Sequence, residues 1–393
     1  MMRLRIVIRH PIRDILYKCL ILFFAALAFS NPVVSPVYAS NCNGGSSGLT
    51  ALTELVGKTY KGHEGGLYPT GNTPPDSFQS AALQAAKQVK PLDADGAPVG
   101  DGSIGLLSIG NSITTLEFTQ FMSLAATDPL INPHLVLADG ALQGVGASPL
   151  AGNILVLWDV IDNRVNQSGL SHKQVQIVWM YQVNNDQRTN MKDDEKLAND
   201  LKIIVQKLKT RFENLKIVYV SSSYYGGYNE DILSAEPNNF ETGFAVKWLI
   251  QSQIEGEQAL NYDASKGPLN APVILWGPYL WTDGVNPRKS DGLTWQCSDL
   301  NDDGVHPSTS GRIKISKLLL NFMQTDLTAR PWYLSDESQN ARVDLLVFPP
   351  EPFPDIYLAI ILATVGLAII VIFIVRRRRA NEVDENDYSN EDN

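Results

Sequence analysis

The sequence has 393 residues, 44% of them hydrophobic, and its 42 acidic and 32 basic residues give a formal net charge of -10. This length suits one large domain with accessory segments, and the acidic balance argues against nucleic-acid binding, which needs a basic face. Only three cysteines occur, which excludes a fold built on several disulfides.

The amino terminus has the pattern of an export signal. Five basic residues precede an apolar segment over 19–29, and Val37-Tyr38-Ala39 resembles a small-x-small cleavage site before Ser40. We predict that 1–39 is a signal peptide, with an uncleaved anchor as the alternative. A lipoprotein through Cys42 is less favoured, because Cys42 lies far from the apolar segment.

After signal cleavage, two cysteines remain, Cys42 and Cys297. They would lie in a compartment that permits disulfides. A bridge between them would tie the amino-terminal arm to the region before Asp303, and two free or buried thiols are the alternative.

The region 76–328 alternates between two patterns, after an irregular Gly-, Pro- and Thr-containing arm over 40–75. Apolar runs predict strands over 104–109, 134–138, 174–181, 215–221 and 273–276. Helical periodicity predicts helices over 77–89, 115–126, 153–165, 192–212, 240–254 and 308–323. This alternation predicts an α/β fold, a three-layer α/β/α sandwich around a mostly parallel five-stranded sheet of the flavodoxin-like class.

The carboxyl terminus has the pattern of a membrane anchor. Prolines make 329–355 a predicted extended stalk. The uncharged run 356–375 is long enough for a transmembrane helix, and four arginines follow it directly. Because such arginines stay on the cytoplasmic side, we expect a type I single-pass protein of the cell membrane, with 40–355 extracellular and 376–393 as a cytoplasmic tail.

Two segments at opposite ends of the α/β region suggest a catalytic site. The strand 104–109 ends at Gly110-Asn111-Ser112, with Thr114 or Thr115 as the expected N-cap of the next helix. Ser112 would then lie at the carboxyl edge of the sheet, where open α/β sheets bind ligands.

The second segment is Asp303-Gly304-Val305-His306-Pro307, with Ser308 as the expected cap of the closing helix. His306 is the only one of the five histidines that lies in a candidate catalytic motif. A serine nucleophile needs a base such as His306, and Asp303 is close enough in sequence to orient the imidazole.

The two segments together resemble the first and last blocks of the SGNH (GDSL) hydrolases, normally Gly-Asp-Ser and Asp-x-x-His-Pro. The resemblance covers about 76–328, and it departs from the family in having Asn111 where an Asp is usual. It implies the flavodoxin-like fold and a serine esterase in which Ser112, Asp303 and His306 are catalytic. It also implies that no metal or organic cofactor is required.

The same resemblance implies an oxyanion hole, formed by the N–H of Ser112, a glycine of the second block and an asparagine of the third. Gly140 and Gly144 both follow the strand 134–138, and Gly140 is preferred for its place just past the strand. In the third block Gln182 replaces the usual glycine, and Asn184 is preferred over Asn185. These departures indicate a divergent Gly-Asn-Ser branch.

The substrate is expected to be an O-acyl ester. Aromatic residues after the strands could line a cleft and stack on sugar rings, which favours an acylated saccharide over a long-chain lipid, although packing in the core is as good an interpretation of each: Tyr224, Tyr225, Tyr228, Trp276, Tyr279, Trp281 and Trp295. An O-acyltransferase on the same fold and a catalytically inactive binding module are the alternatives.

An acidic segment, Asp299-x-Asn301-x-Asp303-Gly304, matches the first half of a calcium-binding EF-hand loop, and Asp93-x-Asp95-Gly96 is a shorter version. The twelfth position after Asp299 holds Ser310 instead of Glu. We interpret both segments as polar turns.

Overall fold

The computed structural model describes residues 40–184, 191–229 and 235–339. The described residues up to Tyr333 belong to one compact unit, and 334–339 belong to a second. The predicted signal peptide, transmembrane segment and tail lie outside the described residues. Within the described part of the chain, every helix is too short or too polar to span a bilayer.

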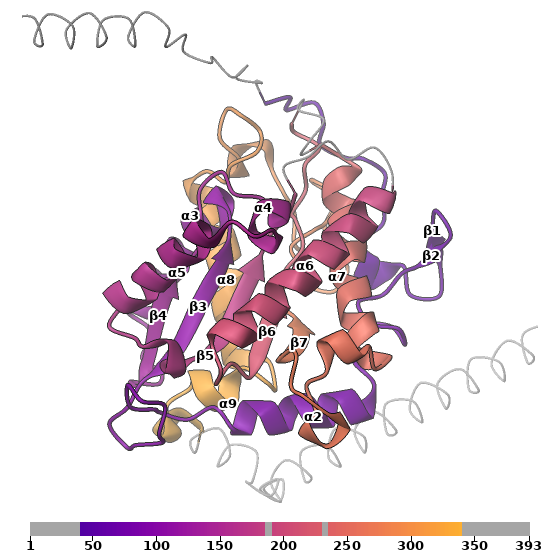
Figure 1. Cartoon of the computed structure of the whole chain (residues 1–393). Coiled ribbons are helices and arrows are strands. Elements are labelled where there is room, and N and C mark those ends of the chain that lie inside the picture. Colours follow the sequence, from indigo (N-terminus) through magenta and orange to yellow (C-terminus); the bar gives the residue numbers. More distant parts are fainter. Residues whose placement is uncertain (1–39, 185–190, 230–234, 340–393) are drawn as a thin grey trace, which may run out of the picture. The chain divides into compact units, whose positions relative to one another are not determined.

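A five-stranded parallel sheet forms the centre of the first unit (Figure 1). Its spatial order is β4-β3-β5-β6-β7, and each neighbouring pair is parallel. The strands are β3 (Ile104–Gly110), β4 (Leu135–Asp139), β5 (Val175–Tyr181), β6 (Ile217–Val220) and β7 (Val273–Trp276). Counted along the chain this is the order 2-1-3-4-5 of flavodoxin-like sheets, so the predicted fold class is confirmed for the sheet and its flanking helices.

Helices cover both faces of this sheet. On one face α3 (Ser112–Ala125) packs against α8 (Thr309–Thr325), and the other face carries α4 (Ala147–Ala151), α5 (Leu155–Gln167), α6 (Met191–Arg211) and α7 (Asn238–Ile254) (Figure 1). The helix α2 (Asp76–Lys87) lies at the end of the sheet opposite the carboxyl ends of the strands, and α9 (Arg330–Tyr333) contacts both α2 and α8.

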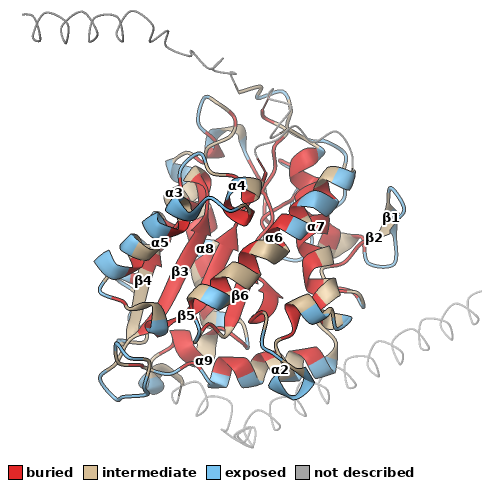
Figure 2. Ribbon diagram, viewed as in Figure 1, coloured by how far each residue is buried: buried red, intermediate tan, exposed pale blue. Residues whose placement is uncertain are grey.

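Burial differs between the two edge strands of the sheet (Figure 2). Every residue of the edge strand β7 and of the inner strands β3, β5 and β6 is buried, whereas the other edge strand, β4, is mostly half-buried. This agrees with the nearly continuous apolar sequences of the four buried strands, because a parallel sheet covered on both faces needs apolar side chains at every position.

Apart from shifts in the bounds of several elements, three differences from the predicted elements lie in α3, α4 and α9. The first helix after β3 begins at Ser112, three residues early, and its N-cap is Asn111 instead of Thr114 or Thr115. The short helix α4 has no counterpart among the predicted elements. Residues 330–333 form α9 within the first unit, where the sequence indicated the start of an extended stalk.

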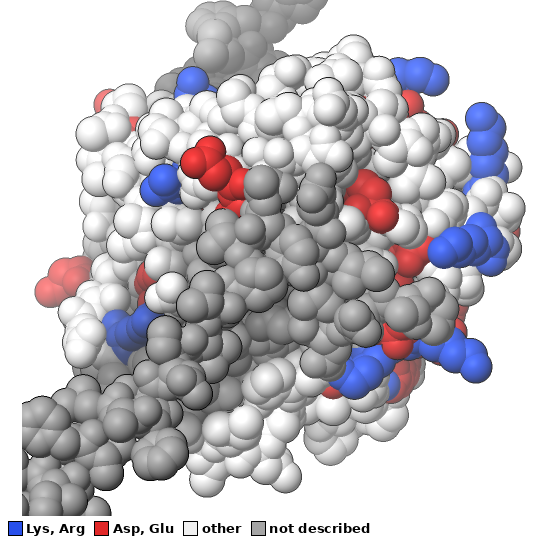
Figure 3. All heavy atoms as spheres, turned by 90° about the horizontal axis from the view of Figure 1, so that it is seen from above, with Lys and Arg blue, Asp and Glu red and all other residues white. Residues whose placement is uncertain are grey.

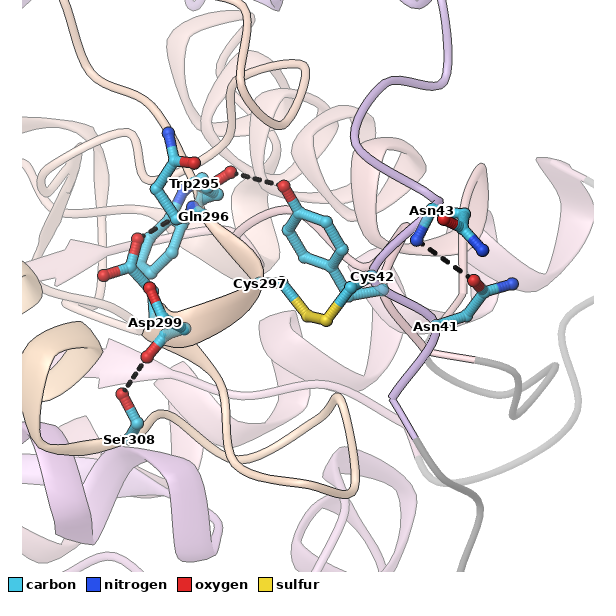
Figure 4. Close-up of a disulfide and its surroundings, with 10 residues drawn as sticks. Asn41, Cys42, Asn43, Trp295, Gln296, Cys297, Asp299 and Ser308 are labelled. Carbon is cyan, nitrogen blue, oxygen red and sulfur yellow. Dashed lines mark hydrogen bonds between the residues drawn. A yellow bond between two sulfur atoms is a disulfide. The ribbon is translucent and has the colours of Figure 1, made fainter.

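The arm over 40–75 belongs to the same unit, and a disulfide links it to a loop much later in the chain. It contains a short 3-10 helix, η1 (Leu52–Glu54), and a small hairpin of β1 (Thr59–Tyr60) and β2 (His63–Glu64). Cys42 and Cys297 form a disulfide (Figure 4), which resolves the alternative that the sequence left open. The bridge thus connects the arm to the loop that leads to Asp303 and His306.

Candidate active site

Ser112 lies where the sheet changes its direction of winding. It follows β3, and the neighbouring strand β5 runs beside β3 with Gly110 opposite Tyr181. The helix after β3 covers one face of the sheet and the helices before and after β5 cover the other, which makes the gap between these two strand ends the topological switch point. Ligands of doubly wound sheets bind at such a point.

The turn between β3 and α3 depends on a glycine. A Cβ at Gly110 would lie 1.9 Å from the Thr114 hydroxyl and 2.2 Å from the Tyr181 carbonyl oxygen, so no larger residue fits. The Thr114 hydroxyl donates to that carbonyl at 2.6 Å, and the Asn111 side chain accepts from the N–H of Ile113 at 3.0 Å. These contacts start α3 directly at the strand end, with half-buried Ser112 as its first residue.

Asp303 and His306 share a tight loop before α8. One carboxylate oxygen of Asp303 accepts from the N–H groups of Val305 and His306, each at 2.9 Å, and the other lies 2.7 Å from Nδ1 of His306. The loop is closed by an N–H of Asn301 that donates to the His306 carbonyl at 2.8 Å. Ser308 caps α8, as the sequence predicted.

The hydrogen bonds also set the charge of Asp303. Partial burial raises the pKa of its carboxyl, but the backbone N–H groups of Val305 and His306 and the imidazole outweigh this effect and hold the pKa below its usual value. Asp303 is therefore a carboxylate at neutral pH, which can only accept hydrogen bonds.

Ser112, His306 and Asp303 form one hydrogen-bonded chain. The Ser112 hydroxyl oxygen lies 3.0 Å from Nε2 of His306. Because the Asp303 carboxylate only accepts, Nδ1 carries the proton in the neutral ring, and Nε2 is left to accept from the serine hydroxyl. Two segments almost two hundred residues apart thus meet in the geometry of a nucleophile, a base and an orienting acid.

Gly140 was predicted to donate its N–H to the oxyanion, but that N–H has a partner in the fold. Its N–H donates to the carbonyl of Ser108 at 3.1 Å, where it extends the pairing of β4 with β3. Asp139 is fixed in the same turn, because its carboxylate accepts from the Ser108 hydroxyl at 2.6 Å and from the N–H of Ala141 at 3.1 Å. The N–H of Gly140 is thus already engaged, which corrects the preference for it as an oxyanion donor.

Two other donors remain on this side. Ser112 is the first residue of α3, and N–H groups of a first helical turn have no partner within the helix. Asn184 is buried three residues after β5, and its Nδ2 lies 3.2 Å from Asp200, which engages one of its two N–H bonds. Gly144, the alternative glycine, lies in the following turn with φ at 75°, and Asn185 lies outside the described residues.

The aromatic side chains after the strands do not form a binding cleft. All seven are at most 6% exposed, in contacts such as that of the Tyr224 and Trp295 rings, whose centroids are 4.7 Å apart. The hypothesis that they stack on sugar rings is wrong, since packing against one another has buried their faces.

A buried acid on α3 is absent from the sequence hypothesis. Glu117 lies five residues after Ser112 on the inner side of α3, fully buried, and neither of its carboxyl oxygens has a hydrogen-bond partner among the described residues. Burial raises the pKa of this carboxyl well above its usual value, so the group is held neutral. The position of Glu117 between apolar Leu116 and Phe118 gave no signal of its role in the fold.

Where described residues are visible from above, Lys and Arg side chains lie mainly towards the rim, between uncharged and acidic side chains (Figure 3). The described residues also contain no group of three or more His, Cys, Asp or Glu that could hold a metal ion. In the acidic segment, Asp299 accepts from the N–H of Gln296 at 2.8 Å and pairs with Lys314, as expected of a polar turn.

Comparisons with known proteins give structural similarity without sequence similarity. No family model and no curated protein matches the sequence. Similar solved structures include a carbohydrate esterase family 3 protein from Talaromyces cellulolyticus, with 14% identity, a TM-score of 0.32 and coverage of 55% of this chain and 93% of that chain. A candidate SGNH hydrolase from Slackia heliotrinireducens has 14% identity, a TM-score of 0.30 and coverage of 56% and 100%. A candidate acylhydrolase from Bacteroides fragilis has 12% identity, a TM-score of 0.33 and coverage of 64% and 96%. Similarities this low assign neither a family nor a reaction to this chain.

Proposed function

We propose that this protein is a serine esterase of the SGNH type, which hydrolyses O-acyl esters through an acyl-enzyme. The observation that carries the proposal is the hydrogen-bonded chain from the Ser112 hydroxyl through His306 to Asp303. The distance between Ser112 and His306 joins side chains of different elements, so it adds support from the fold to that of the sequence motifs.

In the first half of the reaction, Nε2 of His306 takes the proton of the Ser112 hydroxyl as its oxygen attacks the ester carbonyl. Asp303 stabilises the imidazolium that forms and keeps the ring in place. The imidazolium then returns the proton to the leaving alcohol, and the acyl group stays on Ser112. Water, activated by the same imidazole, releases the acid and restores the serine.

The attack places negative charge on the former carbonyl oxygen, and that charge needs donors that are already in position. We assign this role to the N–H of Ser112 and to the second N–H of the Asn184 amide, with Gly144 as the third candidate. The first of these is also favoured by its helix, because α3 begins at Ser112 and presents the positive end of its dipole there.

The proposed substrate is an O-acyl ester whose alcohol part is left open. The aromatic side chains that favoured a sugar as the alcohol are buried in the core. From the sequence we also propose that residues 1–39 direct export and that 356–375 anchor the protein in the cell membrane with the enzyme outside. An acylated saccharide remains one substrate to assay among other small O-acyl esters.

The proposal is tested with the full chain and p-nitrophenyl acetate. We expect p-nitrophenol release with an initial burst, and loss of release in Ser112→Ala but not in Ser123→Ala, whose serine lies exposed on the same helix. Transfer of acetyl to an added saccharide in place of acetate release would favour the acyltransferase alternative. A folded protein without Ser112-dependent turnover would favour the inactive binding module.

A further inference from the structure

The orientation of the Asn184 amide is fixed by its neighbours. Its oxygen accepts from the backbone N–H of Ser148 at 2.9 Å, at the start of α4. A backbone N–H can only donate, so the amide oxygen faces α4 and the amide nitrogen faces the other way. The nitrogen donates one N–H to Oδ2 of Asp200 on α6, at 3.2 Å.

Asp200 is held by further contacts with the same two helices. The Ser148 hydroxyl donates to Oδ2 of Asp200 at 2.6 Å, and Lys196, one turn earlier on α6, lies 3.3 Å from that oxygen and also contacts the Ser148 hydroxyl. Asn184 is 5% exposed and Asp200 8%. A charged hydrogen bond at such burial is stronger and more directional than one on the surface.

We propose that Asp200 and Ser148 are positioning residues for the oxyanion hole. They hold the Asn184 amide by both ends, so that one N–H is engaged and the other is left to meet the developing oxyanion. This inference rests on the proposed function, and it assigns to α4 and α6 a part in the reaction that no sequence motif indicates. Neither positioning residue touches the substrate or takes part in proton transfer.

The expected effects differ between the donor and the residues that hold it. Asn184→Ala removes a donor and lowers kcat by about 10²–10³-fold. Asp200→Ala leaves the donor but frees its amide to rotate, and misplacement of this kind lowers kcat by up to about 10²-fold. KM changes little in both, since the lost interaction belongs to the transition state. Asp200→Asn keeps an acceptor of the same shape and recovers part of the loss.

The deciding measurement is a double-mutant cycle with p-nitrophenyl acetate. If Asp200 acts through Asn184, the double variant Asn184→Ala/Asp200→Ala has the kcat of Asn184→Ala alone. Multiplied losses, or a wild-type kcat in Asp200→Ala, overturn the inference. In both of these outcomes Ser112-dependent turnover of the wild type remains, so failure of the inference is distinct from failure of the proposed function.

Stability is controlled with Asp162→Ala. Asp162 on α5 pairs with Arg211 on α6 at 2.8 Å, so this variant also removes a carboxylate that pairs with α6 but does not touch Asn184. We expect its kcat to match the wild type. If Asp200→Ala does not fold, Ser148→Ala serves instead. It removes the hydroxyl that donates to Asp200 and keeps the backbone N–H that binds the Asn184 amide oxygen. A lower kcat at an unchanged melting temperature supports the inference, and an unchanged kcat overturns it.

Discussion

The two halves of the candidate site are built in different ways. In the nucleophile half, Ser112, His306 and Asp303 contact one another directly, and each belongs to a short motif. In the acceptor half, the Asn184 amide is held by Ser148 and Asp200, which come from two helices and belong to no motif. Reacting groups can thus be recognised from short segments, whereas the groups that stabilise charge depend on how separate elements pack.

The largest loss of activity is expected from a substitution in the nucleophile half, at Asp303. With Asp303→Asn the ring of His306 loses its anionic partner, and the amide can donate to Nδ1 and so favour the wrong tautomer. We expect kcat to fall by about 10⁴-fold. The measurement is steady-state hydrolysis of p-nitrophenyl acetate beside Asn184→Ala, and a smaller loss for Asp303→Asn than for Asn184→Ala would contradict the ranking of the two halves.

The disulfide tests how far the nucleophile half depends on the arm. Cys42 and Cys297 are 255 positions apart, so the bridge closes a loop that contains all five strands of the sheet. Replacing both with serine is expected to lower the free energy of unfolding by about 2–5 kcal/mol. Because hydrogen bonds within the loop still hold Asp303 to His306, kcat should fall less than 10-fold, a small change on the scale of about 10⁴ for loss of a triad member.

Urea unfolding of the disulfide variant gives the stability, and ester hydrolysis at the same temperature gives kcat. An unchanged free energy of unfolding would mean that the bridge contributes nothing to the fold. A loss of kcat as large as that of Asp303→Asn would mean that the arm, and not the loop, positions His306.

The smallest expected effect concerns Glu117, the buried acid of α3. The unfolded chain releases the Glu117 proton near about pH 4.3, but the folded protein retains it to a higher pH. Between these two pKa values the folded state binds more protons, so the wild type loses stability as the pH rises. The limiting slope is about 1.4 kcal/mol per pH unit.

Glu117→Gln removes this penalty while keeping the shape of the side chain. We therefore expect its stability relative to wild type to increase from pH 5 to pH 8, measured as the difference in melting temperature. A difference that stays constant across this range would contradict a raised pKa. As a control, Glu195→Gln makes the same substitution at an exposed carboxyl of α6 and should not reproduce the increase seen with Glu117→Gln.

The sequence was sufficient for the sheet and for the nucleophile half. Continuous apolar runs mark strands buried on both faces, and Asp303 and His306 meet within a loop of four residues. The sequence was insufficient for the oxyanion donors, whose availability depends on contacts between separate elements. The N–H of Gly140 is engaged because β4 pairs with β3, a contact between residues far apart in sequence. The carboxylate that holds the Asn184 amide lies sixteen residues later, within α6.

Two further errors have local causes. Threonine and asparagine both cap helices, and the tight fit at Gly110 decides for Asn111 by starting α3 directly at the strand end. The aromatic residues after the strands were open to two interpretations, since an indole or phenol ring suits a core as well as a cleft. Burial of Trp281 and Trp295 decides for the core.

The most direct test of the central claim is active-site labelling of the full chain with a fluorophosphonate. An activated serine forms a covalent adduct with this probe, which intact mass and peptide mapping locate. We expect one adduct, on Ser112, that is lost in Ser112→Ala and strongly slowed in His306→Ala. A folded wild-type protein that takes up no probe, or takes it up at another serine, would contradict the assignment of Ser112 as a nucleophile activated by His306.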